Sequence, residues 1–372
     1  MAAATSGTTC GPPTPAQREV FTCQTQDSHT LVLWRYSAAA AEDAPPRTHP
    51  VLLCHGFASN RFTFDLNPRV SVAEYMARQG WDTWVVELRG SGKSKNTGPS
   101  HEGNTSWCFD DHVEDMRAFV EKVYAVSGKP VHVVGHGMGA MLAQCAAAGV
   151  RTNARMVRSG VSLAGSFVMP ESEWKEFLWL WPVVQTFPTI HPQFIKEILA
   201  PMSFRLNTPW DQLFLRHSNI DADVAREVFS KNWEPIPVSL IAQLRSAVDE
   251  QGLRSADGKA LYADRLGSIS APMLMLAGAK DQQCPPATMQ AAASRVAGST
   301  YQCFGAQHGH KRDYGHFDLL VGLSAHQEVW TVVSDFLHQH DDTAADEVRG
   351  ATAAGQAHDA PVAGRVGMLY EM

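Results

Sequence analysis

The sequence predicts an α/β fold, in which a mostly parallel sheet is covered by helices on both faces and carries a helical insertion. Short apolar runs typical of buried strands alternate with amphipathic helices from about residue 20 to residue 340. A proline-punctuated stretch with helical patterns interrupts this alternation over about residues 168–262. Of the 372 residues 44% are apolar, with 10 Trp and 16 Phe, which is enough for a large buried core.

Each element is predicted from its hydrophobic period and its flanking turn residues. The first two strands should form an antiparallel hairpin, and the strands are expected at 20–24, 30–36, 51–54, 84–88, 131–134, 160–164, 273–277 and 301–304. Helices are expected at 72–79, 110–127, 141–148, 287–296 and 324–338. Gly80 and Gly128 should close two of these helices, and Ser324 with Gln327 should form a capping box at the last one.

The chain is predicted to hold one domain, residues 17–340, between two disordered tails at 1–16 and 341–372. Both tails are rich in Ala, Gly, Pro and Thr and show no periodicity. The insertion at 168–262 follows a strand of the sheet, so it should lie at the carboxyl edge, where a lid over a pocket is expected. An ordinary helical subdomain with tryptophans in its core is the alternative.

Charge and cysteine content exclude several classes of protein. The net charge is −7 and no basic stripe is present, which argues against nucleic-acid binding. Seven scattered cysteines without a C-x-x-C pair favour a reducing compartment, and no window is long enough for a transmembrane helix. A secretory signal is not expected, so the cytoplasm is predicted, with a plastid address as the alternative. The oligomeric state is not predicted.

The turn between the run 131–134 and the following helix carries the main functional information. Its sequence is Gly135-His136-Gly137-Met138-Gly139. A strand, a glycine-bracketed turn and a helix are the setting of the G-x-S-x-G nucleophile elbow, in which a serine projects its oxygen from a sharp turn. Here Gly137 occupies the serine position, so the expected nucleophile is missing.

Four further motifs stand in the order found in the α/β-hydrolase superfamily, which the chain resembles over about residues 18–340. They are the loop His55-Gly56-Phe57, the turn at 87–94, the turn at 276–281 ending in Asp281, and Tyr314-Gly315-His316-Phe317-Asp318. Two segments, Asp281-x-x-Cys284-Pro285-Pro286 and residues 314–322, are also similar to plant and bacterial lipase-like proteins.

The resemblance implies roles for five residues. Asp281 and His316 would be the acid and the base of a triad whose nucleophile position is Gly137. The backbone amides of Phe57 and Met138 would form the oxyanion hole. The Trp- and Phe-rich insertion favours an apolar pocket for a lipophilic ester or acyl ligand. Neither a cofactor nor a metal is expected.

Three interpretations of Gly137 stay open at this point. The favoured one is loss of ordinary ester hydrolysis, so that the pocket binds a ligand without turning it over, because removing such a serine costs on the order of a million-fold in rate. The second is an active hydrolase in which His316 and Asp281 activate a water molecule. The third is a recent or artificial loss of the serine.

Other candidates are weaker. Cys54, Cys145 and Cys284 are expected to be structural, and Ser59 is expected to contact a ligand at most. His308 and His310 share one loop and are expected to be solvated, since one flexible loop is a poor metal scaffold. His136 is expected to pack at the pocket floor, and Asp318 to orient its own loop.

Gly135-x-Gly137-x-x-Ala140 also matches the dinucleotide-binding fingerprint. No Asp or Glu ends the following strand, where Ser162-Leu163-Ala164-Gly165 stands, so this alternative lacks the usual ribose partner.

Overall fold

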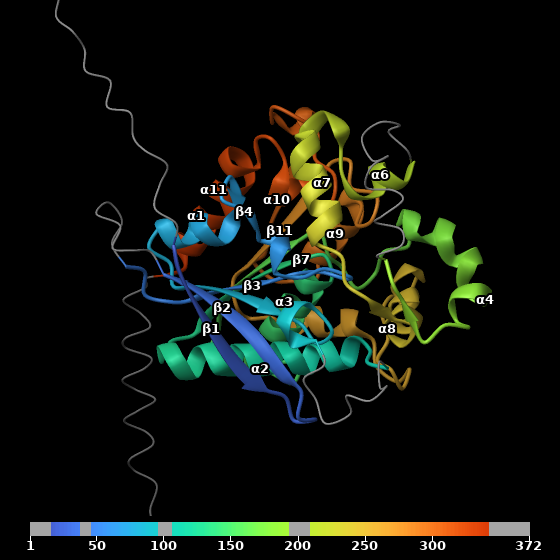
Figure 1. Cartoon of the computed structure of the whole chain (residues 1–372), viewed down its shortest axis with the longest axis horizontal. Coiled ribbons are helices and arrows are strands. Elements are labelled where there is room, and N and C mark those ends of the chain that lie inside the picture. The colour runs from blue at the N-terminus through green and yellow to red at the C-terminus, as the bar shows by residue number, and fades with distance from the viewer. Residues whose placement is uncertain (1–15, 38–45, 96–105, 193–208, 342–372) are drawn as a thin grey trace, which may run out of the picture.

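The computed structural model, which describes residues 16–37, 46–95, 106–192 and 209–341, is organised around an eight-stranded sheet (Figure 1). The strands lie in the order β1-β2-β6-β3-β7-β8-β11-β12. Their bounds are β1 (Gln17–Gln24), β2 (Thr30–Ser37), β3 (Val51–Cys54), β6 (Thr83–Glu87), β7 (Val131–His136), β8 (Val157–Leu163), β11 (Met273–Gly278) and β12 (Thr300–Phe304). The predicted α/β class is confirmed.

The sheet is antiparallel at one edge and parallel elsewhere. The predicted hairpin is present as β1 and β2, and β2 also runs antiparallel to β6. From β6 onward all neighbours are parallel. Every residue of β3, β7 and β11 is buried, as expected for parallel strands covered on both faces. The carboxyl ends of these strands therefore meet at a single edge.

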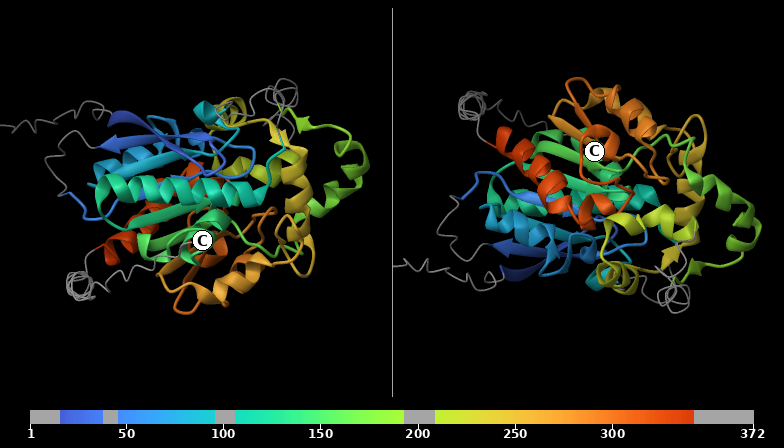
Figure 2. Two further views of the ribbon diagram at one scale, coloured as in Figure 1. Left: turned by 90° about the horizontal axis from the view of Figure 1, so that it is seen from below. Right: turned by 90° about the horizontal axis from the view of Figure 1, so that it is seen from above.

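Helices cover both faces of the sheet (Figure 2). On one face lie α1 and α11, with Tyr75 packed against Trp330, and on the other lie α2 and α3. The bounds are α1 (Val72–Arg78), α2 (Phe109–Ser127), α3 (Met138–Ala147), α9 (Pro286–Ala293), α10 (Asp318–Val321) and α11 (Ala325–Gln339). Gly80 and Gly128 have positive φ at the ends of α1 and α2, as predicted.

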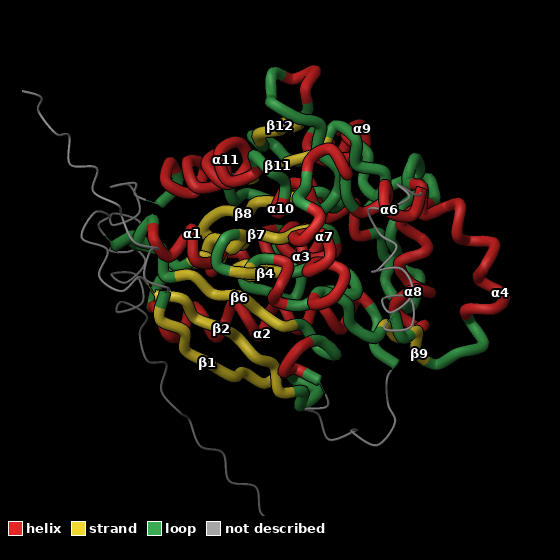
Figure 3. Tube along the Cα trace, turned by 45° about the horizontal axis from the view of Figure 1, so that its top comes forward, coloured by secondary structure: helices red, strands yellow, loops and turns green. Residues whose placement is uncertain are grey.

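The segment between β8 and β11 forms a mostly helical insertion at the carboxyl edge of the sheet (Figures 1 and 3). A two-stranded ribbon joins its parts. The elements are η4 (Glu173–Leu180), α4 (Trp181–Val184), β9 (Thr189–Ile190), α6 (Pro209–Phe214), η5 (His217–Asn219), α7 (Ala222–Lys231), β10 (Ile236–Pro237), α8 (Val238–Leu244), η6 (Arg245–Val248) and η7 (Tyr262–Ser268).

Two local predictions are wrong. The capping box at Ser324 does not form, because a capping residue needs extended backbone and Ser324 has φ −111° and ψ 6°, with no side-chain hydrogen bond to the helix. Helix α3 begins at Met138 rather than at 141, since the chain enters the helix directly from the turn. Of the predicted tails at 1–16 and 341–372, residues 1–15 and 342–372 lie outside the described residues, whereas Ala16 and Asp341 are buried.

Within the described ranges, no helix combines the length and the apolar character needed to cross a bilayer. The six cysteines of this part of the chain are free thiols.

Candidate active site

Gly137 stands at a sharp turn between β7 and α3. Its backbone has φ 58° and ψ −120°, a conformation that residues with a side chain rarely adopt. The turn is fixed from both sides, because the amide of Gly137 donates to the carbonyl of Leu163 at 2.9 Å and its carbonyl accepts from Ala140 at 3.0 Å. A glycine relieves the strain that any other residue would store here.

The glycines around this turn are required by close packing. A Cβ on Gly135 would lie 2.0 Å from the carbonyl oxygen of Gly139, and one on Gly139 would lie 2.2 Å from that of Cys54. A Cβ on Gly165 would lie 2.1 Å from the carbonyl oxygen of Gly137. The turn is therefore held in backbone contact with β3 and with the segment after β8.

His316 and Asp281 are brought together beside Gly137. The Nδ1 of His316 lies 2.9 Å from Asp281 Oδ2, and both side chains are buried. The second carboxylate oxygen, Oδ1, accepts from the amides of Gln283 at 2.8 Å and Cys284 at 3.0 Å. With Nδ1–H held by the carboxylate, the free ring nitrogen Nε2 faces the turn.

The distance between His316 and the turn leaves room for a small side chain on residue 137, which as glycine has none. A Cβ built on Gly137 would lie 3.2 Å from His316 Nε2 and 3.7 Å from Cε1. His316 Nε2 is therefore placed where a hydroxyl on residue 137 would meet it, although Gly137 itself offers no nucleophilic atom.

His136 supports the position of His316. The two rings lie 4.5 Å apart between centroids, and His136 Nε2 is 3.1 Å from the carbonyl oxygen of His316. Burial, followed by the proximity of His316, holds the pKa of His136 well below its ordinary value, so His136 is neutral and donates to that carbonyl. As predicted, His136 packs against the pocket: it is buried and lines the cavity.

The backbone amides of Phe57 and Met138 lie close to the same turn. A Cβ on Gly56 would be 3.5 Å from the nitrogen of Met138 and 3.7 Å from the Cα of Gly137, so the loop after β3 lies against the start of α3. Among the described residues, neither amide N–H has a hydrogen-bond partner. Both remain available to a ligand oxygen.

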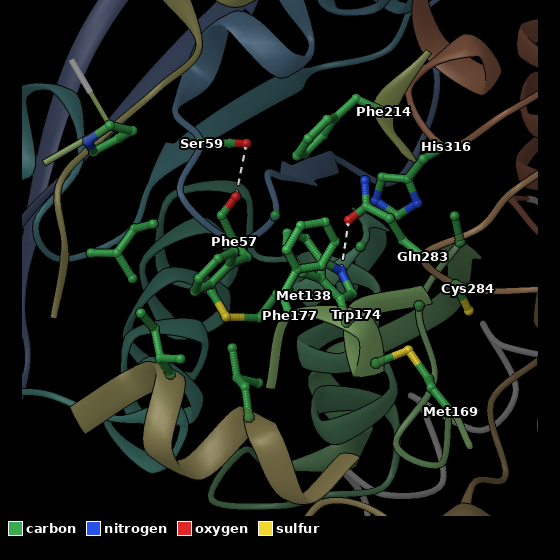
Figure 4. Close-up of a pocket in the computed structure, with 18 of the residues that line it drawn as sticks. Phe57, Ser59, Met138, Met169, Trp174, Phe177, Phe214, Gln283, Cys284 and His316 are labelled. Carbon is green, nitrogen blue, oxygen red and sulfur yellow. Dashed lines mark hydrogen bonds between the residues drawn. The ribbon is translucent and has the colours of Figure 1, made fainter. Parts of the chain in front are cut away.

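The insertion fixes both the loop after β3 and the turn that carries Asp281. Glu234 donates its amide to the carbonyl of Ala58 at 2.8 Å, and its carboxylate accepts from Asn60 at 2.8 Å. Trp174 Nε1 donates to Gln283 Oε1 at 3.1 Å (Figure 4). Sequence reasoning missed these residues, because each pairs with a partner more than a hundred positions away.

A cavity of about 360 Å³ opens onto His316 (Figure 4). His316, Gly137 and Met138 form its floor, and the insertion supplies much of the wall. Apolar side chains dominate the lining, among them Met141, Met169, Trp174, Phe177, Trp181 and Phe229. Ser59, which was expected to contact a ligand at most, lines the cavity while its hydroxyl donates to the carbonyl of Phe57 at 3.1 Å.

The remaining cysteines and histidines considered from the sequence lie away from Gly137 and His316, or are not reactive. Cys54 and Cys145 are buried, and Cys284 lines the cavity, but burial raises the pKa of all three thiols. His308 is exposed, in agreement with the prediction of a solvated histidine. His310 is half-buried, with its ring 4.7 Å from that of Phe304 and its Nδ1 3.2 Å from the amide of Gly305.

Asp318 links the histidine loop to the insertion. Its carboxylate accepts from the amide of Gly315 at 2.6 Å, as predicted for a residue that orients its own loop. The amide of Arg216 also donates to it, at 3.0 Å. Burial raises the pKa of Asp318 to about 7, against an ordinary value of 3.8, in spite of these two hydrogen bonds.

The raised pKa of Asp318 predicts a pH-dependent stability. The folded protein favours the protonated form of the Asp318 carboxyl. The contribution of this group to the free energy of unfolding is therefore complete below pH 3.8 and is lost as the pH rises through about 7. Asp318→Asn keeps a neutral group at this position. The free energy of unfolding of the native protein is therefore expected to fall relative to the variant, by about 1.4 kcal/mol per pH unit inside this window. Urea unfolding at a series of pH values measures the difference.

Asp335→Asn, on the exposed side of α11, is the matched control for the Asp318 measurement. A difference between native protein and Asp318→Asn that stays flat from pH 4 to pH 7 would show that Asp318 is ionised throughout, and the prediction would then be wrong.

Comparison with known proteins agrees with this fold. The family model described as alpha/beta hydrolase fold matches residues 49–323. The chain belongs to the α/β-hydrolase family. Lipase 1 of Drosophila melanogaster is 30% identical over 129 residues, which are 33% of this chain and 28% of that protein. Triacylglycerol lipase 1 of Arabidopsis thaliana is 28% identical over 127 residues, which are 32% of this chain and 31% of that protein. The matches thus span about a third or less of these relatives.

Solved structures of hydrolases share the fold at low sequence identity. An esterase from Thermogutta terrifontis superposes with a TM-score of 0.58 at 18% identity, covering 88% of this chain and 100% of that chain. A bacterial membrane phospholipase A gives a TM-score of 0.57 at 16% identity, covering 88% of this chain and 87% of that chain.

Proposed function

We propose that this protein binds a lipophilic ester or acyl ligand in the cavity and that its ordinary serine-type ester hydrolysis is impaired. The observation that carries the proposal is Gly137, which stands at the position of the nucleophile in a turn that is otherwise complete. The serine of a hydrolase attacks the carbonyl carbon after the histidine removes its proton. Without that hydroxyl the first covalent step has no nucleophile.

The surroundings of Gly137 support a site of the hydrolase type. His316 and Asp281 form a hydrogen-bonded pair, and the free amides of Phe57 and Met138 are the donors of the proposed oxyanion hole. A ligand carbonyl that rests on these two amides would have its acyl chain in the apolar cavity. The insertion would act as a lid, since it walls the cavity and contacts both loops.

The lipophilic class of ligand is supported by the lining of the cavity and by the relatives. A cavity with a few polar groups at one end and apolar side chains elsewhere suits an ester or acid head with a hydrocarbon chain. Two curated relatives are named lipases, although each matches over a limited part of its length.

An active hydrolase that uses water is the second candidate. The missing hydroxymethyl group leaves space beside His316 Nε2, and a water molecule there would be deprotonated by the imidazole while Asp281 stabilises the resulting cation. This mechanism needs no covalent intermediate. Activity of the unmodified protein that disappears in His316→Ala would favour it.

The dinucleotide alternative has less support. The glycines of its fingerprint are accounted for by backbone packing, since Gly135 contacts Gly139, and β8 ends in Leu163 without a carboxylate. Binding of a nicotinamide or flavin nucleotide that is unaffected by His316→Ala would restore it.

Acyl binding is tested with a fluorescent medium-chain fatty acid and with competing acyl esters. The unmodified protein is expected to bind the probe, and Leu244→Trp should weaken binding by roughly tenfold, because Leu244 lines the cavity and a larger ring occupies ligand space. Val126→Trp, at an exposed position of α2, is the control that adds the same ring elsewhere. Absence of both probe binding and ester turnover in the folded protein would overturn the proposal.

A further inference from the structure

Three buried side chains with metal-binding atoms meet at the edge of the sheet opposite the cavity. His49 precedes β3, His132 is the second residue of β7, and Asp341 follows α11. One ligand atom from each lies within 4.8 Å of the others. The relative exposures are 8%, 0% and 2%, so water does not surround any of the three.

His132 carries a nitrogen that has no partner inside this cluster. Its Nδ1 lies 2.7 Å from Ser159 Oγ, whereas Nε2 is buried and forms no hydrogen bond among the described residues. The nearest acceptor, Asp341 Oδ1, is 3.7 Å from Nε2, which is beyond hydrogen-bond distance. Leaving a buried polar atom unpaired costs about 1–3 kcal/mol, so this nitrogen calls for a ligand.

We propose that His49, His132 and Asp341 bind a zinc ion. Two imidazole nitrogens and a carboxylate oxygen are ligands that zinc prefers, and water can take a fourth position. Ligand atoms of a tetrahedral zinc stand roughly 3.3–3.5 Å apart, given bonds of about 2.0–2.1 Å. The separations here bracket that value, at 2.9 Å for His49 Nδ1 to Asp341 Oδ1 and 3.7 Å for His132 Nε2 to the same oxygen.

The hydrogen-bond partners of His132 suit a cation, because only one of its two ring nitrogens has a partner among the described residues. If Nδ1–H donates to Ser159, the lone pair of Nε2 faces the cluster, which is the usual way a hydroxyl or carbonyl orients a metal-bound histidine. His49 is able to carry its proton on the other ring nitrogen and to present Nδ1 to the ion.

Backbone donors hold the third ligand in place. The carboxylate of Asp341 accepts from the amides of Thr48 and His49, both at 2.9 Å. The guanidinium of Arg158, which donates to the carbonyl of His340 nearby, opposes a cation at this position.

The location of the cluster assigns the ion a structural role. It lies at the amino ends of β3 and β7, whereas His316 and the cavity lie at the carboxyl ends. An ion there would join the segment before β3, the strand β7 and the end of α11. His49 and Asp341, the first and last of these ligands in the sequence, are 292 residues apart.

The test is a titration of chelator-treated, full-length protein with zinc by calorimetry, and with cobalt by visible absorption. One equivalent of zinc should bind, cobalt should give the intense bands of a tetrahedral site, and zinc should raise the Tm. Asp341→Asn, which keeps a side-chain oxygen for one of the two backbone amides that the carboxylate binds, should abolish the binding of this equivalent of zinc. Ser159→Ala should weaken zinc binding by roughly 10–100-fold, because it removes the group that orients His132.

Two control variants separate this cluster from other zinc-binding groups. His308→Asn combined with His310→Asn removes loop histidines, and His316→Ala removes the histidine of the cavity; both proteins should keep the full equivalent. The proposal is overturned if the folded native protein binds no stoichiometric zinc, or if Asp341→Asn and Ser159→Ala bind it as the native protein does.

Discussion

Gly137→Ser is expected to raise ester hydrolysis by a factor between about 10³ and 10⁶. The upper figure is the order of the loss when a serine hydrolase loses its nucleophile, and the lower figure allows for imperfect geometry. The His316–Asp281 pair, the free amides and the cavity are already in place, so the hydroxyl is the missing part. Initial rates on a chain-length series of chromogenic acyl esters, for both proteins side by side, give the ratio.

The added side chain fits with a small adjustment. A Cβ on residue 137 would stand 3.2 Å from His316 Nε2, so the imidazole has to shift by a few tenths of an ångström. The backbone conformation, with φ 58°, disfavours serine and should lower the free energy of unfolding by about 1–3 kcal/mol. A gain in activity is therefore expected together with a loss in stability.

Gly137→Ala is the matched control, since it adds the same Cβ and strain without a hydroxyl. It should lose the same stability and gain no activity. Comparable, His316-dependent turnover by the native glycine form and by Gly137→Ser would instead support the water mechanism. A folded serine variant without turnover would show that the dyad is not competent, which contradicts the idea of a silenced hydrolase.

Gly135→Ala is expected to destabilise the fold by about 4–5 kcal/mol or more. The new Cβ would lie 2.0 Å from the carbonyl oxygen of Gly139 and 2.2 Å from its carbon. Both belong to the backbone of a helix packed on the central strands, so neither can move aside cheaply. The loss would far exceed the effect of an ordinary Gly-to-Ala change. Thermal and urea unfolding, or failure to obtain soluble protein, record the result.

Gly267→Ala is the control for this substitution. A Cβ on Gly267 would have nothing within 4 Å, and its φ is not positive, so alanine there should leave stability unchanged or raise it by about 0.4–1 kcal/mol. If Gly135→Ala is as stable as Gly267→Ala, the close backbone contact between β7 and α3 is not required by the fold.

Local sequence patterns were sufficient for the sheet and for the main helices. Buried strands such as β7 and β11 are short apolar runs with glycine at their ends, and the parallel order follows from their alternation with helices. The pairing of His316 with Asp281 was expected from the resemblance to the α/β-hydrolase superfamily, since both residues stand in its motifs. Helix boundaries were less accurate, as at Ser324, because they depend on the backbone conformation of one residue.

The remaining contacts of the site depend on pairs that are remote in the sequence. Glu234 reaches Asn60, and Trp174 reaches Gln283, without any motif that marks these residues. The cluster of His49, His132 and Asp341 lacks the short ligand spacing by which zinc sites are recognised in sequences. Only the folded chain brings such groups together.

The tryptophans around the cavity, among them Trp174 with its indole hydrogen bond to Gln283, have a practical consequence for optical measurements. Among the described side chains, the tryptophans Trp174, Trp181 and Trp233 line the cavity. Indole emission depends on the polarity around the ring, and an apolar guest would displace water from these rings. The protein therefore carries its own spectroscopic reporter, and rapid mixing with unlabelled ligands can resolve entry and exit in real time.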